Sequence, residues 1–88
     1  MLITLRQLEY VIAVAETGSF SKAAERCSAE QSTVSQQVRT LEERLGVSLF
    51  DRSSLPVKIT SDGRMVVEKA KDILARVDGL VKPFRTNK

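Results

Sequence analysis

Apolar residues recur at helical spacing in three segments within the first half of the chain. Their spacing of three and four positions predicts helices over residues 5–17 and 31–45, with a helix of about two turns between them, within residues 20–27. Gly18 and Gly46 follow the first and third segments, where glycine adopts the left-handed conformation that ends a helix. Two helices joined by a short turn, the second with a polar outer face, predict a helix-turn-helix.

Capping residues mark where the first two helices begin. Thr4 and Gln7 have the spacing of a capping box, and Ile3 and Leu8 are placed to form a hydrophobic staple around it. Ser19 is a typical N-cap for the second helix. Both helix starts are therefore specified locally.

After the third helix the hydrophobic period changes from helical to alternating. Residues 57–60 alternate between apolar and polar side chains, with Lys58 among the polar ones, which predicts a strand exposed on one side. Residues 49–52 are expected to pair with it across a turn of residues 53–56. A hairpin this small is marginal by itself, so we expect it to lean on the helices as a wing.

The end of the chain predicts a longer helix over residues 62–82, capped by Thr60 or Ser61. Pro83 removes one helical hydrogen bond, so we expect the helix to fray or bend between Gly79 and Pro83. The tail to Lys88 is expected to be loose.

Six apolar residues of this last helix follow one another at spacings of 4, 3, 4, 3 and 4, which is the a/d pattern of a coiled coil. This seam consists of Val66, Ala70, Ile73, Val77, Leu80 and Phe84. One interpretation is dimerisation, and the other is that the seam covers the first helix of its own subunit. The seam extends over about 27 Å at helical rise, which is longer than a small domain needs as a lid. We therefore favour a homodimer.

Together these elements predict a mainly α fold. Residues 1–60 are expected to form a winged helix-turn-helix of three helices and a small β-hairpin. Residues 61–88 are expected to form a long dimerisation helix with a loose tail.

Composition excludes several classes of protein. The chain has 88 residues, one cysteine and no histidine, so it forms no internal disulfide and lacks the usual residues of hydrolase and zinc sites. Its longest apolar stretch, residues 10–15, is far too short for a membrane span, and no signal peptide is evident. We expect a cytoplasmic protein that is not an enzyme and uses no metal or cofactor. Cys27 is expected to be a buried thiol.

The net charge of +3 is unevenly distributed, with −1 over residues 1–50 and +4 over residues 51–88. A basic half is compatible with a polyanionic partner. In the third helix, the outer face is neutral in its N-terminal half, whereas Glu42 and Glu43 lie in its C-terminal half. If this helix meets DNA, its N-terminal end must therefore enter, with the positive end of the helix dipole near phosphate.

Individual side chains on this face suit individual contacts. Gln36 has the two hydrogen-bonding groups that read adenine, and Arg39 suits guanine or the DNA backbone. Thr33 and Ser35 are expected to bind phosphate oxygens. The competing interpretation is an ordinary solvated helix face, which the short preceding helix and the basic wing make less favoured.

Several short segments, in unbroken order from Leu5 to Gly63, form a recognisable set. They are residues 5–10, 18–24, 31–38, 41–42, 45–46 and 49–52, followed by Thr60 and Gly63. The set resembles the N-terminal region of LysR-type transcriptional regulators.

This resemblance implies a winged helix-turn-helix followed by a linker helix that pairs antiparallel with its twin. It implies sequence-specific binding of double-stranded DNA by a homodimer, at an inverted-repeat operator. The DNA contacts it implies come from Gln31, Ser32, Thr33, Ser35, Gln36, Arg39 and Arg52, to which Lys58 on the wing adds a further basic candidate. Whole members carry a C-terminal domain that senses a small molecule, so an effector is expected only if such a domain follows.

The sequence departs from the family pattern at three places. Residues 30–32 read Glu-Gln-Ser where Ser-Gln-Pro is common, so Ser28 becomes a candidate cap for the third helix. Leu55 stands where a basic residue is frequent, and Gln36 where arginine is frequent.

The alternative function is a helical protein-interaction module that binds no specific DNA.

Overall fold

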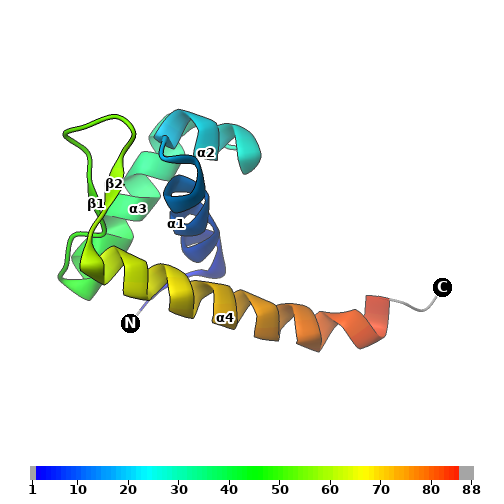
Figure 1. Cartoon of the computed structure of the whole chain (residues 1–88). Helices are drawn as coiled ribbons and strands as arrows, with labels where there is room; N and C mark the ends of the chain where they lie inside the picture. The colour runs from blue at the N-terminus through cyan, green and yellow to red at the C-terminus, as the bar shows by residue number, and fades with distance from the viewer. Residues whose placement is uncertain (1, 86–88) are drawn as a thin grey trace.

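The computed structural model describes residues 2–85 and confirms a mainly helical winged fold (Figure 1). Within these residues, four helices and one two-stranded sheet follow one another. They are α1 (Leu5–Thr17), α2 (Phe20–Arg26), α3 (Gln31–Leu45), β1 (Phe50–Asp51), β2 (Lys58–Ile59) and α4 (Ser61–Arg85).

The predicted capping box at the start of α1 is confirmed. Thr4 Oγ1 accepts a hydrogen bond from Gln7 N over 3.1 Å, and Gln7 Oε1 accepts one from Thr4 N over 3.0 Å. The Gln7 side chain, only 4% exposed, also donates to Gln37 Oε1 over 2.9 Å. The cap therefore fixes the start of α1 and ties it to α3 at the same time.

The core lies where α1, α2 and α3 meet, and β1 and α4 close it. The small side chains of Ala23 and Ala24 are buried and let α2 approach its neighbours closely. Phe20 of α2 packs edge-on against Phe50 of β1, with ring centroids 6.1 Å apart. The largest fully buried side chains are Val11, Val14, Val34, Val38, Leu41 and Leu49.

The turn between α2 and α3 matches one prediction in part and differs from another. Cys27 ends α2 as its C-cap and is only partly buried against the core, so the prediction of a buried thiol is confirmed in part. Ser28 has a φ of 53°, and the N-cap of α3 is Glu30, so Ser28 does not cap α3. The Glu30 side chain makes no capping hydrogen bond to α3, although its carbonyl accepts from Val34 N over 3.1 Å.

The predicted wing forms, with strands of only two residues each. Phe50 pairs with Ile59 and Asp51 with Lys58 in an antiparallel register. The hairpin leans on the turn between α1 and α2, because Val57 N donates to Gly18 O over 2.8 Å. Strands this short need such outside support.

Of the two predicted caps for α4, Thr60 is the one that forms, since its Oγ1 accepts from Gly63 N over 2.9 Å. The helix then continues through Pro83 to Arg85, so the prediction that it frays between Gly79 and Pro83 is wrong, while the alternative of a bend there stays a prediction. Pro83 lies in the last turn, where it forfeits one hydrogen bond only, the one to the Gly79 carbonyl. The tail to Lys88 lies outside the described residues.

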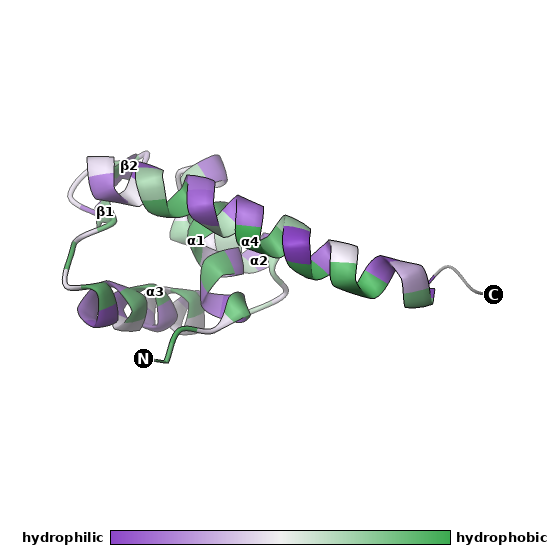
Figure 2. Cartoon of the chain, turned by 90° about the horizontal axis from the view of Figure 1, so that it is seen from below, coloured by the Kyte–Doolittle hydropathy of each residue, from purple (hydrophilic) through white to green (hydrophobic). Residues whose placement is uncertain are grey.

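The helix α4 has 25 residues, or about 37 Å at 1.5 Å per residue, and extends beyond the rest of the fold (Figures 1 and 2). Its first half packs on α1, with Val67 and Ala70 buried and Val66 half-buried. Leu80 and Phe84 are 69% and 79% exposed. The second interpretation of the seam thus holds for its first part only.

Candidate nucleic-acid interface

The outer face of α3 is open, as the helical projection predicts. Val34, Val38 and Leu41 point into the core. Ser32, Thr33, Gln36, Arg39 and Glu43 are exposed on the opposite face, where Ser35 is half-buried, and Gln31 is exposed in the first turn. Five of the predicted contact residues are therefore accessible between Gln31 and Arg39 of α3.

The start of α3 combines a favourable dipole with an unfavourable charge. The first backbone N–H groups of a helix point outward and carry partial positive charge, which suits a phosphate. The exposed carboxylate of Glu30 stands at this end. An anionic partner therefore meets attraction from the helix terminus and repulsion from one side chain.

Arg52 does not extend outward from the wing as the sequence suggested. Its Nη1 donates to Ser35 Oγ over 3.0 Å, and its Nη2 lies 3.3 Å from Glu42 Oε1. The guanidinium also stacks over the Phe20 ring, 4.5 Å from its centroid. Its side chain is only 24% exposed, so Arg52 braces the wing against α3.

The surroundings of Arg52 shift the pKa of its guanidinium, with a net lowering. Burial lowers the pKa of the Arg52 guanidinium most strongly, Glu42 raises it, and the nearby charge of Arg39 lowers it again. Arg39 therefore lies close enough to Arg52 for the two positive charges to repel each other.

Glu42 is a structural residue that the sequence reading took for a surface charge. Its Oε2 accepts hydrogen bonds from Leu49 N over 2.8 Å and Phe50 N over 3.4 Å, while its Oε1 faces Arg52. Its position directly after Leu41, at the edge of the buried stripe, was the available signal. This carboxylate fixes where the wing leaves α3.

Lys58 is exposed on β2, where the sequence placed it, opposite Asp51. The Asp51 carboxylate accepts from the hydroxyl and amide of Ser53, over 2.6 and 3.0 Å. These two hydrogen bonds, with a smaller contribution from the charge of Lys58, hold the pKa of Asp51 below its usual value. The base of the wing is therefore a fixed, charged turn.

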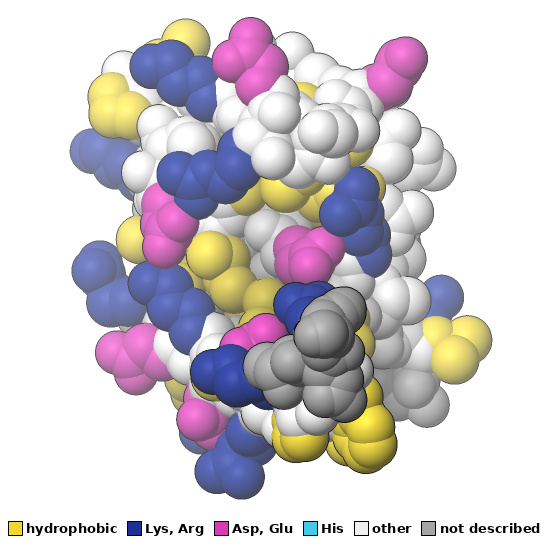
Figure 3. Space-filling view, turned by 90° about the vertical axis from the view of Figure 1, so that its right-hand side faces the viewer, with side chains coloured by type: hydrophobic (Ala, Val, Ile, Leu, Met, Phe, Trp, Pro, Cys, Tyr) yellow, Lys and Arg dark blue, Asp and Glu magenta, His cyan; other side chains and the backbone are white. Residues whose placement is uncertain are grey.

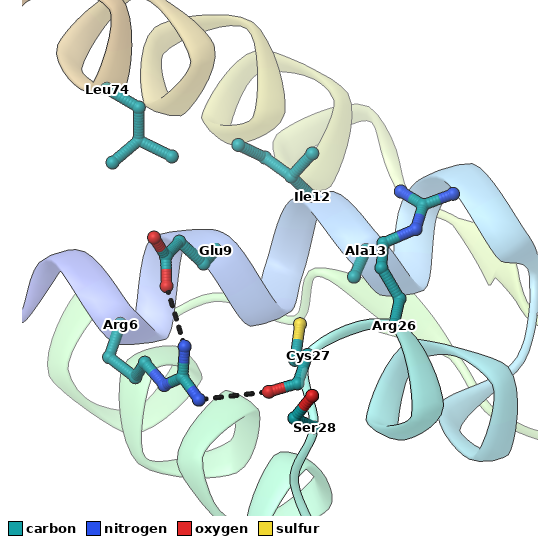
Figure 4. A pocket seen from close by; sticks show the side chains of 8 residues that line it. All are labelled: Arg6, Glu9, Ile12, Ala13, Arg26, Cys27, Ser28 and Leu74. Carbon is teal, nitrogen blue, oxygen red and sulfur yellow. Dashed lines mark hydrogen bonds and ion pairs between the residues drawn. The ribbon is translucent and has the colours of Figure 1, made fainter. Parts of the chain in front are cut away.

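A hollow on another side of the molecule lies between α1, the end of α2 and α4 (Figure 4). Arg6 bridges it, because its guanidinium binds Glu9 Oε1 over 3.1 Å and the Cys27 carbonyl over 3.0 Å. Its Nε also donates to Tyr10 Oη over 3.1 Å. These contacts clamp the turn that orients α3.

Among residues 2–85, no group of side chains is placed to hold a metal ion. None of the helices in this part of the chain could span a membrane.

Comparison with known families and proteins adds independent information. Residues 5–64 match the family described as bacterial regulatory helix-turn-helix protein, lysR family. The regulator BenM of Acinetobacter baylyi is 43% identical over 77 residues, which are 88% of this chain and 25% of BenM. The hydrogen peroxide-inducible genes activator of Haemophilus influenzae is 38% identical over 85 residues, or 97% of this chain and 28% of that protein. The chain thus spans about a quarter of the length of these relatives.

Two solved structures have nearly the same extent as this chain. The DNA-binding domain of BenM in complex with benA site 1 DNA has a TM-score of 0.89 and 40% identity, covering 94% of this chain and 93% of that one. The DNA-binding domain of CbnR in complex with DNA has a TM-score of 0.88 and 36% identity, covering 94% and 95%. The chain therefore belongs to the LysR family of bacterial regulatory helix-turn-helix proteins.

Proposed function

We propose that this chain binds double-stranded DNA sequence-specifically, as a homodimer, and serves as the DNA-binding domain of a transcription regulator. The observation that carries this proposal is the exposure of Thr33 and Gln36 in the N-terminal half of α3, and of Arg39 just beyond its midpoint. Burial of these side chains under other parts of the chain would have excluded it. The DNA complexes of the BenM and CbnR domains support the same function.

The chemistry of α3 assigns the roles within the interface. Gln36 presents an amide that reads adenine in the major groove, and Arg39 reads guanine or binds the backbone. Thr33 and Ser35 bind phosphate oxygens, while Gln31 and Ser32 lie at the N-terminus, where the dipole favours phosphate. Because Ser35 Oγ accepts from Arg52, its own hydroxyl proton remains available to donate.

The wing contributes in two ways. We infer that Arg52 acts mainly by positioning, since its guanidinium is committed to Ser35 and Glu42. Lys58, exposed on β2, supplies positive charge toward the neighbouring backbone. We also propose that residues 1–60 form the DNA-binding unit and residues 61–88 the linker, because α4 is the element that extends beyond the rest of the fold (Figure 1).

Dimerisation uses the part of α4 that its own head leaves uncovered. Leu80 and Phe84 are largely exposed, and Ile73 is partly exposed, all on the a/d seam. Viewed from the end of α4, hydrophobic side chains lie at the lower edge of the molecule and also at its centre and upper left, interspersed with acidic and basic ones (Figure 3). Apolar surface placed this regularly is typical of a helix-pairing interface.

The seam also favours an antiparallel partner. Its spacing of 4, 3, 4, 3 and 4 reads the same in both directions, so an antiparallel copy sets Phe84 opposite Val66 and Leu80 opposite Ala70. An apolar groove runs beside these two inner seam residues, lined in part by Leu8, Leu41 and Met65. An antiparallel copy sets its exposed Leu80 and Phe84 against this groove, whereas a parallel copy sets these two residues only against their own counterparts.

This arrangement has consequences for the site on DNA. Two-fold symmetry implies an inverted repeat whose half-sites face the same side of the duplex. A cytoplasmic location and the absence of catalysis follow from the role. A small-molecule effector acts on the protein only through a further domain.

A salt-titrated gel shift tests this proposal. We expect a specific duplex to be retained at physiological ionic strength while random duplex is released. The rival, a protein-interaction module, predicts that no specific duplex is retained.

The dimer has its own test, in which Leu80→Asp is expected to give monomers in sedimentation equilibrium. Ala75→Asp, with the same charge at an exposed position off the seam, is expected to leave dimers. Dimers in both variants would contradict the proposal that the seam forms the dimer interface.

A further inference from the structure

Leu55 is the most exposed large apolar side chain among residues 2–85, with 85% of its surface open to solvent. It lies in the loop between β1 and β2. Neither the core nor the seam of α4 uses this side chain. This apolar side chain at the tip of the wing is therefore accessible to a partner outside the chain.

The loop that carries Leu55 is held in place, so its exposure does not come from a loose segment. On one side, Asp51 binds the amide and hydroxyl of Ser53. On the other side, Pro56 lies so close to Gly18 that a Cβ at Gly18 would come within 2.9 Å of the proline Cβ. Ser54 Oγ donates to the Pro56 carbonyl over 3.3 Å. These contacts point the tip in one direction.

The tip carries no charge with which to bind phosphate. Residues 53–57 are Ser, Ser, Leu, Pro and Val. The nearest cations along the chain are Arg52, which is turned toward α3, and Lys58, which stands opposite Asp51. A contact made by this tip is therefore apolar, and its strength depends little on salt.

The position of the tip identifies the surface that it meets. In Figure 1 the loop between β1 and β2 rises at the end of the molecule where α3 begins, away from α4. The loop also starts beside the recognition face, because Arg52 binds Ser35. A duplex that receives the N-terminal half of α3 in its major groove thus passes beneath the tip, with an adjacent groove facing it.

We propose that Leu55 enters the minor groove next to each half-site and packs against deoxyribose and base edges, so that it selects flanking sequence by groove shape and deformability. This inference rests on the proposed DNA-binding function. The walls of the minor groove are formed by sugar C–H groups, which an isobutyl side chain can contact without a hydrogen bond. Apolar side chains used in this way favour steps that open easily, because opening costs free energy that depends on sequence.

Three variants of the full chain test the proposal by measuring affinity across a salt series, on a duplex selected by the unaltered protein. Leu55→Ala is expected to bind about tenfold more weakly at every salt concentration, with an unchanged slope of log K against log salt. Leu55→Met, which keeps an apolar chain of similar size, is expected to retain the affinity. Leu55→Arg is expected to steepen the slope by about 1.8, the effect of one added phosphate contact from each subunit of the dimer.

Melting temperature serves as the folding control, and it should be the same in all three variants because the side chain is exposed. Wild-type affinity in Leu55→Ala, or an unchanged salt slope in Leu55→Arg, would show that the tip does not reach DNA and would overturn the proposal. A wild-type chain that selects no duplex at all would instead overturn the DNA-binding function itself.

Discussion

Arg52 and Glu42 face each other across 3.3 Å, which joins the wing directly to α3. The same carboxylate accepts backbone N–H groups at the start of β1, and the same guanidinium reaches Ser35. Because the side chains of both partners are mostly buried, this contact fixes the angle between the wing and α3 within the protein itself. The wing and α3 therefore behave as one unit.

Removing Glu42 tests this unit. Glu42→Ala leaves the Leu49 N–H without its acceptor and Arg52 without its counter-charge, so we expect a loss of about 1–3 kcal/mol in the free energy of unfolding. Glu43→Ala changes the exposed neighbour and should stay within about 0.5 kcal/mol of the wild type. Urea denaturation measures both. Equal effects of the two variants would mean that the carboxylate of Glu42 holds nothing in place.

Two glycines of α4 form a matched pair for a second test. A Cβ at Gly63 would lie 2.1 Å from the Leu49 carbonyl oxygen, whereas at Gly79 it would meet no atom of the described residues within 4 Å. Gly63→Ala should therefore destabilise the protein by about 1–3 kcal/mol, since backbone must move. Gly79→Ala should stabilise it by about 0.5–1 kcal/mol through helix propensity. Thermal unfolding distinguishes them, and a tolerated Gly63→Ala would contradict the close packing of α4 on Leu49, the residue before β1.

Much of this fold is local and was accessible from the sequence. The bounds of α1 and α3 follow from apolar periodicity and from the glycines that end them, and both predictions are confirmed. The openness of the outer face of α3 is confirmed for the same reason. The role of that face in binding DNA remains a prediction.

What the sequence did not reveal depends on side chains that meet across long separations. Arg52 has several possible directions until the wing docks, and only the docked wing brings Ser35 and Glu42 within reach. Pro83 is another case, because its cost depends on how many turns follow it. Only two residues of α4 follow Pro83, so the helix tolerates it.

Glu16 makes the stability of the fold depend on pH. Its carboxylate binds Arg26 of α2 and lies 3.2 Å from Lys71 Nζ of α4. Chiefly the Arg26 hydrogen bond, and then the one from Lys71, hold the pKa of Glu16 below its usual value of 4.5. A lowered pKa in the folded state means that the stabilisation is present above about pH 4.5 and is lost as the pH falls through the folded-state pKa.

Glu16→Gln is therefore expected to cost at most about 1 kcal/mol at neutral pH, because the pair is partly exposed. The difference from the wild type should disappear in strongly acidic buffer and shrink in high salt. Glu68→Gln, at an exposed position of α4, is the control. Denaturation curves across a pH series give the result, and a difference that persists at low pH would refute the assignment.

Glu30 offers a way to separate helix capping from charge. Asp and Ser are both better N-caps than Glu, so Glu30→Asp and Glu30→Ser should each stabilise the protein by roughly 0.5–1 kcal/mol. Only Glu30→Ser removes the negative charge at the end of α3 that meets phosphate. We therefore expect tighter DNA binding from Glu30→Ser alone, measured by fluorescence anisotropy. Equal affinities of the two variants would place Glu30 away from the DNA.

The central claim is that the N-terminal half of α3 reads base edges, and selection of bound duplexes from a random pool tests it most directly. The wild-type chain is expected to enrich an inverted repeat, and Gln36→Ala to lose preference at one position in each half-site, with a cost of about 1–3 kcal/mol there. Enrichment of the same sequence by both proteins, or of none by the wild type, would contradict the claim.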